Sequence, residues 1–418
     1  MKKAFNLLLF CLFSVVNCIA QNHQLDSLLN VFKIAKEDSN KVNILNNLFL
    51  EYEFSDEKKA KKCLDDALQL ARKIDYKKGE GTAYTLLGYF AEDKGNYEEA
   101  LKKHTISLEI FKAIGNKKKE AAAYSNIGII HYNEGNYSEA LKNQHISLKI
   151  KESIQDKNGQ IASYNSIGNI YSAQGNYSEA LKVYFIFLKI AEEVGDTKAK
   201  SSAYNNIGII YMRQNNFPEA LKNYLAALKI ETKLNNKKGI ARTYNNIGNI
   251  YFAQKNYSKA LNNYEASLKI EEAFGDKQCI ANSYNNIGNV YSDFIEENST
   301  ASIRKERLDI SLKNHFISLK IREEIGDKVG INSSFYNIGN VLLKQHKYSE
   351  ANDYLNKANE ISKLIGDKSA IRNSYSALTE LNIATKNYKE AYENHKLYIL
   401  YRDSLDNEET KKKRYKHK

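Results

Sequence analysis

The chain has 418 residues, of which 42% are hydrophobic, one is proline and none is tryptophan. Its length exceeds what one hydrophobic core usually supports, and the near absence of proline removes the main helix breaker. The formal net charge is +12, but two of the basic residues are at positions 2 and 3 and six more lie in residues 411–418. The sequence therefore favours an all-α array over a β-sandwich or an α/β enzyme. It predicts no basic face for nucleic acid, because the charge lies mostly at the two ends.

The first 20 residues are typical of a secretory signal peptide. Two lysines precede the apolar run Leu7–Val16, and the small residues Cys18 and Ala20 precede a cleavage site at Gln21. The apolar run is too short to span a bilayer, which takes about 20 residues. A lipoprotein signal acylated on Cys18 is the alternative, but Asn17 is not the small residue that such a signal needs. We therefore expect a periplasmic or secreted protein with a signal peptide over 1–20 and a mature start at Gln21.

The rest of the chain repeats itself with a period of 40 residues. Two of the recurring series are Tyr84, Tyr124, Tyr164, Tyr204, Tyr244 and Tyr284, and Gly88, Gly128, Gly168, Gly208, Gly248 and Gly288. The period is interrupted once, by 11 residues that fall within 292–307, before it resumes at Phe335 and Gly339. We predict nine repeats over 39–408, a capping helix within 21–38 and a basic tail over 409–418. Within the insertion, Glu296–Thr300 has the composition of a loop, and the residues after it are expected to lengthen the helix that follows.

Each repeat has the pattern of two helices. Tyr244, Ile247, Gly248 and Tyr251 follow the spacing i, i+3, i+4, i+7, which places them on one helix face. The second helix is expected to start after Asn256, a good N-cap. Its buried stripe is Ala260, Leu261, Tyr264 and Leu268. Small residues at the glycine and alanine positions would let the two helices approach closely. A Gly-Asp-Lys sequence between several repeats provides a C-cap glycine and then an N-cap aspartate.

These residues resemble the tetratricopeptide repeat. The family's aromatic-x-x-Leu-Gly-x-x-Tyr stretch matches Tyr244, Ile247, Gly248 and Tyr251, and its later alanine and aromatic match Ala260 and Tyr264. The resemblance implies an all-α, right-handed superhelical solenoid of nine antiparallel helix pairs. The period of 40 exceeds the usual 34, and the family's closing proline is absent. Both departures predict longer helices in each repeat.

Asparagines occupy the middle of the first helices, although asparagine is a poor residue for a helix interior. At about 100° per residue, they fall on the face that points away from the partner helix. We call this set the asparagine strip, and the resemblance places it in the concave groove of the array. It contains Asn126, Asn165, Asn169, Asn205, Asn206, Asn245, Asn246, Asn249, Asn285, Asn286, Asn289, Asn337 and Asn340.

Two interpretations of the asparagine strip stay open. Carboxamides offer two donors and an acceptor, so a row of them can bind the main chain of an extended peptide whatever its sequence. Alternatively, each asparagine bonds the adjacent first helix or its own backbone and forms a stacking ladder. The two roles can coexist at different positions. In either case, the strip consists of uncharged amides, so it is not expected to bind a C-terminal carboxylate strongly.

No catalytic or cofactor-binding motif is found. Phosphate-binding glycine loops, zinc-protease and nucleophile-elbow signatures are all missing, so we expect no enzyme activity, no cofactor and no metal site. His104, His145, His315 and His395 fall on second helices of different repeats. The cysteines of the mature chain, Cys63 and Cys279, lie more than five repeats apart, so they are expected to be unpaired and buried.

The sequence thus predicts a non-enzymatic scaffold whose partner is a protein or peptide. The signal, the leading helix and the charged end also resemble the extracytoplasmic sensor part of bacterial histidine kinases, so a sensor module parted from its kinase is an alternative. An intracellular scaffold is a second alternative. The basic tail could also make weak contact with an anionic membrane.

Overall fold

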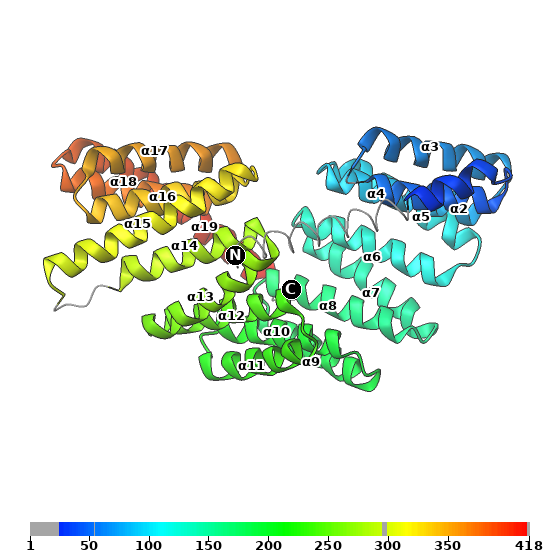
Figure 1. Cartoon of the computed structure of the whole chain (residues 1–418), viewed down its shortest axis with the longest axis horizontal. Coiled ribbons are helices and arrows are strands. Elements are labelled where there is room, and N and C mark those ends of the chain that lie inside the picture. The colour runs from blue at the N-terminus through cyan, green and yellow to red at the C-terminus, as the bar shows by residue number, and fades with distance from the viewer. Residues whose placement is uncertain (1–24, 54, 295–298, 416–418) are drawn as a thin grey trace, which may run out of the picture. The chain divides into compact units, whose positions relative to one another are not determined.

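The computed structural model describes residues 25–53, 55–294 and 299–415. Every regular element in these ranges is a helix (Figure 1). The predicted signal peptide and the cleavage site at Gln21 lie outside the described residues. The chain divides into two compact units, Met1–Gly195 and Asp196–Lys418, which are described separately.

The first unit contains four helix pairs after a short helix over 25–34. Its helices are α2 (Ser39–Tyr52), α3 (Glu57–Lys73), α4 (Lys77–Asp93), α5 (Tyr97–Ala113), α6 (Lys117–Asn133), α7 (Tyr137–Ser153), α8 (Lys157–Ala173) and α9 (Tyr177–Glu193). Each even-numbered helix packs antiparallel against the next one in the chain, and neighbouring pairs stack through contacts such as α2 with α4 and α6 with α8 (Figure 1).

The second unit contains five pairs built in the same way. Its helices are α10 (Thr197–Arg213), α11 (Phe217–Lys233), α12 (Lys237–Ala253), α13 (Tyr257–Phe274), α14 (Lys277–Asp293), α15 (Ala301–Glu324), α16 (Lys328–Lys344), α17 (Tyr348–Ile365), α18 (Lys368–Ala384) and α19 (Tyr388–Tyr415). First helices of successive pairs touch each other, as α10 and α12, α14 and α16, and α16 and α18 do. The expected all-α fold with nine antiparallel pairs is confirmed for the described part of the chain.

Local sequence signals fix the helix ends. The Asn256 side chain accepts a hydrogen bond from the backbone N–H of Lys259 at 3.2 Å, which caps α13. At the other end of α13, Gly275 has a φ of 71°, a left-handed conformation that glycine adopts without strain. Asp276 then caps α14 through the N–H of Cys279 at 3.2 Å. The predicted caps of this repeat are therefore confirmed.

The repeated glycine lets the two helices of a pair come close. A Cβ at Gly248 would lie 2.6 Å from Cε1 of Tyr264, whose side chain is 2% exposed. Ala260, one turn before that tyrosine, is fully buried. The tyrosine ring thus occupies the space that a glycine leaves on the facing helix, so this repeat needs a small residue opposite the ring of Tyr264.

The insertion lengthens one helix. Most helices have 17 residues, whereas α15 has 24 and begins at Ala301, with Thr300 accepting from the N–H of Ile303 at 3.3 Å. This gain is about two turns, so the expected lengthening is confirmed. The last helix, α19, runs to Tyr415 and so enters the segment assigned to the basic tail.

Candidate functional site

The asparagine strip is divided between the two units. Asn126, Asn165 and Asn169 lie on α6 and α8 of the first unit, and the other ten members lie on α10, α12, α14 and α16 of the second. Most of these side chains are buried or half-buried, and Asn169 is exposed. The strip is therefore longest in the second unit, where consecutive first helices carry it.

Three hydrogen bonds join asparagines of successive first helices in the second unit. Asn246 Nδ2 donates to Asn205 Oδ1 at 2.9 Å. In the same way, Asn286 Nδ2 donates to Asn245 Oδ1 at 3.2 Å, and Asn337 Nδ2 donates to Asn285 Oδ1 at 2.9 Å. The bond at Asn337 keeps the same repeat positions although the insertion separates its partners by 52 residues. The stacking ladder is thus present at these six positions.

Other members of the strip pair with tyrosines. The hydroxyl of Tyr264 donates to Asn249 Oδ1 at 2.7 Å, and that of Tyr184 donates to Asn169 Oδ1 at 2.6 Å. In the first unit, Asn126 Nδ2 donates to the hydroxyl of Tyr89 at 2.9 Å. The first two bonds tie a first helix to the second helix of its own pair.

Two asparagines of the strip differ from the rest. Asn289 on α14 and Asn340 on α16 are half-buried and make no side-chain hydrogen bond to any residue that the structure describes. Asn165 and Asn206 do have partners. The amides of Asn289 and Asn340 are thus free to bind a ligand, whereas the ladder already uses those of the six paired residues.

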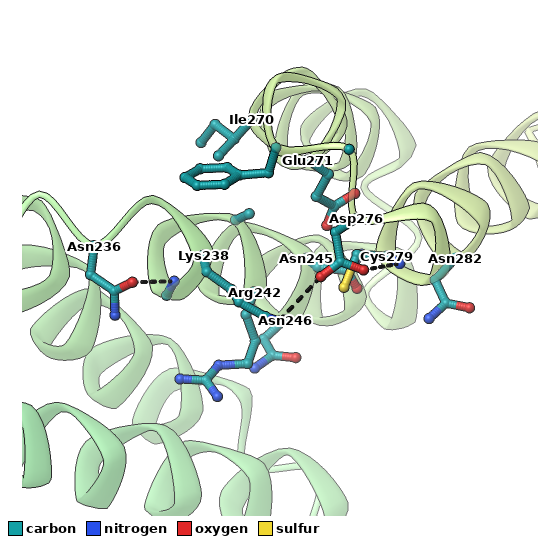
Figure 2. A pocket seen from close by; sticks show the side chains of 14 residues that line it. Asn236, Lys238, Arg242, Asn245, Asn246, Ile270, Glu271, Asp276, Cys279 and Asn282 are labelled. Carbon is teal, nitrogen blue, oxygen red and sulfur yellow. Dashed lines mark hydrogen bonds and ion pairs between the residues drawn. The ribbon is translucent and has the colours of Figure 1, made fainter. Parts of the chain in front are cut away.

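The strip borders a hollow between α12, α13 and α14, which we call the α13 hollow (Figure 2). Its volume is about 680 Å³. Asn245 and Asn246 line it from α12, together with Arg242, while Phe274 contributes an apolar ring that is 59% exposed. Arg242 makes no hydrogen bond or ion pair within the described ranges. The α13 hollow therefore combines amides, a free guanidinium and exposed apolar surface.

A buried carboxylate also borders the α13 hollow. Glu271 is 7% exposed and accepts hydrogen bonds from the hydroxyls of Ser267 at 2.8 Å and Ser283 at 2.7 Å. Across the same hollow, Lys238 and Asp276 form an ion pair at 3.2 Å (Figure 2). Glu271 and Asp276 thus have hydrogen-bond or ion-pair partners within the protein. Arg242 is the charged group of this hollow that remains available to a ligand.

The cysteine prediction needs one correction. Cys63 is buried as expected, but Cys279 is only half-buried and lines the α13 hollow. Its place in the first turn of α14 leaves it beside the hollow rather than in the core. Burial raises the pKa of both thiols to about 11.

A second hollow lies along the first helices farther down the chain. Its volume is about 440 Å³, and its lining includes Asn289 of α14, Asn340 of α16, Glu380 of α18 and the fully buried His315 of α15. We call it the His315 hollow. A smaller hollow of about 260 Å³ is lined by Asn285 and Asn337. Each of these three hollows, which described residues of the second unit form, is thus bordered by members of the strip.

The structure brings together no metal-binding group among the residues that it describes. The four histidines named above lie on four different helices, α5, α7, α15 and α19. None of the helices in the described ranges is both long and apolar enough to cross a bilayer. Neither His315 nor Arg242 is predicted as a site residue from the sequence. The signal that identifies such residues is a difference between equivalent positions of the repeats.

The chain matches the sequence profile described as "Tetratricopeptide repeat" over residues 79–144, 119–184, 199–273 and 239–308, together more than half of its length. No curated protein matches it. Among solved structures, it is similar to the apo form of the quorum sensor NprR from B. thuringiensis, with 16% identity, a TM-score of 0.55, and coverage of 87% of this chain and 99% of that one.

Two Rap structures are similar as well. The apo form of RapI has 16% identity and a TM-score of 0.54, covering 69% of this chain and 99% of its own. A Rap protein in complex with competence and sporulation factor has 12% identity and a TM-score of 0.51, covering 83% of this chain and 99% of its own. At these identities the likeness shows a shared fold.

Proposed function

The chain belongs to the tetratricopeptide repeat family, and from this premise we propose that it is a non-enzymatic protein that binds an extended peptide segment along the asparagine strip of its second unit. One observation carries the proposal. The strip borders three hollows there, and Asn289 and Asn340 line one of them without partners of their own among the described residues. Amides in this state bind a peptide main chain without regard to its side chains.

The similar structures support this proposal at the level of the fold. One of them is a Rap protein complexed with competence and sporulation factor. Another is described as a quorum sensor. We infer that the present chain uses the same arrangement of helix pairs to bind a partner protein or peptide.

The test is selection from a random peptide library displayed on phage, with the chain that starts at Gln21 as bait. Enrichment of peptides that compete with one another for a single site is the expected result. Failure to enrich any peptide over a bait of unrelated helical repeats would refute the proposal. A parallel selection with the Asn289→Ala and Asn340→Ala double variant checks that the strip is the site.

We also propose that the protein works outside the cytoplasm, in the periplasm or after secretion. The lysines, the apolar run Leu7–Val16 and the small residues before Gln21 support this location. Mass spectrometry of the protein from its native cells should find Gln21 at the N-terminus. Recovery of the chain with Met1 in the cytosolic fraction would instead support an intracellular scaffold.

A sensor module is the second candidate function. The observation that favours it is α19, which has 28 residues where most helices have 17 and is rich in charged residues. A long charged helix can transmit a change in the array to an output domain. Cross-linking of the intact protein in its native membranes to a histidine kinase, dependent on α19, would support this candidate, and a freely diffusing protein would count against it.

A further inference from the structure

The repeat that borders the His315 hollow departs from the pattern of the three repeats before it. In three consecutive repeats, Tyr184, Tyr224 and Tyr264 each pack a ring against the glycine of the facing first helix. In the next repeat, the ring that packs against Gly288 belongs to His315, with Cε1 2.7 Å from the position of an added Cβ. The imidazole thus takes the place of a tyrosine ring, but it is shorter and has no hydroxyl.

The missing hydroxyl leaves polar groups unsatisfied. In the preceding repeat, the Tyr264 hydroxyl donates to Asn249, the residue that follows the repeated glycine. The corresponding residue after Gly288 is Asn289, and its side chain makes no hydrogen bond in the part of the chain that the structure describes. Both ring nitrogens of His315 are also buried without a partner there. A buried polar atom without a partner costs free energy, so the site favours a ligand that satisfies it.

His104 occupies the same repeat position as His315, but its imidazole has a hydrogen-bond partner. It packs against Gly88 in the same way, but its Nε2 lies 2.8 Å from Oε1 of Glu92. The equivalent of Glu92 in the later repeat is Ser292, whose hydroxyl accepts from Lys344 at 2.8 Å. His315 therefore lacks the internal partner that His104 has, and it faces a hollow instead.

The His315 hollow also has an apolar wall. Phe252, Val341, Leu343 and Ala377 line it beside the polar atoms of His315, Asn289 and Asn340. Its charged lining residues are Glu380 and the ion pair of Lys344 with Asp293 at 3.1 Å. Burial, followed by the positive charges of Arg322 and Lys344, lowers the pKa of His315 to about 3. The imidazole is therefore neutral at physiological pH and offers one donor and one acceptor. This environment suits an uncharged group that has a large apolar body and a polar tip.

We propose that the His315 hollow binds the side chain of a tyrosine in the bound peptide, with its phenol hydroxyl between His315 and Asn289. The ligand tyrosine would provide the hydroxyl that the repeat's own tyrosine provides to Asn249 in the preceding repeat. This proposal rests on the proposed peptide binding and specifies one side chain of the partner. It assigns the remaining contacts along the strip to the peptide main chain.

The test uses two probes that differ only in the hydroxyl, N-acetyl-L-tyrosinamide and N-acetyl-L-phenylalaninamide. They are titrated into the full chain carrying ¹⁵N-labelled histidine, and the imidazole resonances are followed by NMR. The tyrosine probe should shift the His315 resonances and leave those of His104 unchanged. It should bind about fivefold more tightly than the phenylalanine probe, as expected for one net hydrogen bond.

Two matched variants separate binding from folding. His315→Tyr restores the residue that three other repeats carry, so the chain should remain folded while its own hydroxyl fills the site. Affinity for the tyrosine probe should then fall about tenfold or more. His104→Tyr makes the same change in the first unit and should leave the affinity unchanged.

Equal affinity of the two probes, unshifted His315 resonances, or wild-type affinity in His315→Tyr would each overturn the proposal. Tighter binding of N-acetyl-L-serinamide than of the tyrosine probe would also overturn it, because the aromatic body would then contribute nothing. The probes are single amino-acid amides, so a negative result refutes the tyrosine site but does not test the binding of extended peptides. The phage selection tests that binding. A positive result together with a failed selection would refute the proposed function alone.

Discussion

The asparagine ladder predicts an unusual order of stabilities for one set of variants. Asn246 donates to the buried Asn205 at 2.9 Å. Replacing either residue by alanine removes a hydrogen bond worth about 1 kcal/mol net and gains about 0.6 kcal/mol of helix propensity. Each single variant should therefore lose about 0.4 kcal/mol. The double variant loses the bond once and gains the propensity twice, so it should be about 0.2 kcal/mol more stable than the wild type.

Native-state hydrogen exchange of amides in α10 and α12 is the suitable assay, because repeat arrays open locally and a single global unfolding free energy is poorly defined for them. The double-mutant cycle should give a coupling energy of about 1 kcal/mol between the two asparagines. The matched control pairs Asn246→Ala with Asn263→Ala, whose side chain bonds only the backbone of its own helix. Additive effects at Asn205 and Asn246, equal to those of the control pair, would refute the ladder.

Two further predictions concern packing and pH. Gly248→Ala gains about 1 kcal/mol of helix propensity but places a Cβ 2.6 Å from the buried Tyr264 ring, so overpacking of about 1–3 kcal/mol should dominate. Gly128→Ala places a Cβ 3.0 Å from Nε2 of Gln144 and 3.2 Å from the backbone oxygen of Ala140. These contacts are longer than the one at Gly248, so this variant should lower the melting temperature less. Equal losses would contradict this reasoning. Lys151 is buried between the hydroxyls of Ser125 and Ser163, and burial lowers its pKa below the usual 10.5. The Lys151 amine therefore binds its proton more tightly in the unfolded chain than in the folded one. The free energy of unfolding of the first unit should then increase as the pH rises toward 10.5. Lys151→Met should lack this gain in urea titrations at a series of pH values, and an unchanged pH profile would show that the lysine is not responsible.

The helix pairs could be predicted from the sequence because the determinants of pairing are local and repeated. The glycine and alanine positions recur every 40 residues, and a tyrosine faces the glycine in three consecutive repeats. The structure confirms the steric role of these residues at Gly248, Ala260 and Tyr264. The asparagine, aspartate and threonine side chains that cap the helices bond backbone N–H groups within three residues of themselves. The same holds for the longer α15, since the helical pattern continues through the insertion.

The distribution of roles along the strip could not be predicted in this way. Whether Asn246 meets Asn205 or solvent depends on how one first helix lies against the next, about 40 residues away in sequence. Asn249 and Asn289 occupy equivalent positions in the repeat, yet only Asn249 accepts a hydrogen bond from a tyrosine hydroxyl. This difference arises because His315 replaces the tyrosine on the second helix of the pair. A search for metal-binding or catalytic motifs does not detect such a replacement. Aligning the repeats by position would have identified it.

Peptide affinity measured on two triple variants shows whether a peptide binds along the asparagine strip. The first variant, Asn249→Ala with Asn289→Ala and Asn340→Ala, removes strip amides that the ladder does not use. The control, Asn223→Ala with Asn263→Ala and Asn314→Ala, removes asparagines of second helices that donate to a backbone carbonyl of their own helix. For a peptide obtained by selection on the wild type, isothermal titration calorimetry should show an affinity loss of about tenfold or more in the first variant and little change in the control. Equal affinities in the wild type and both variants would contradict binding along the asparagine strip.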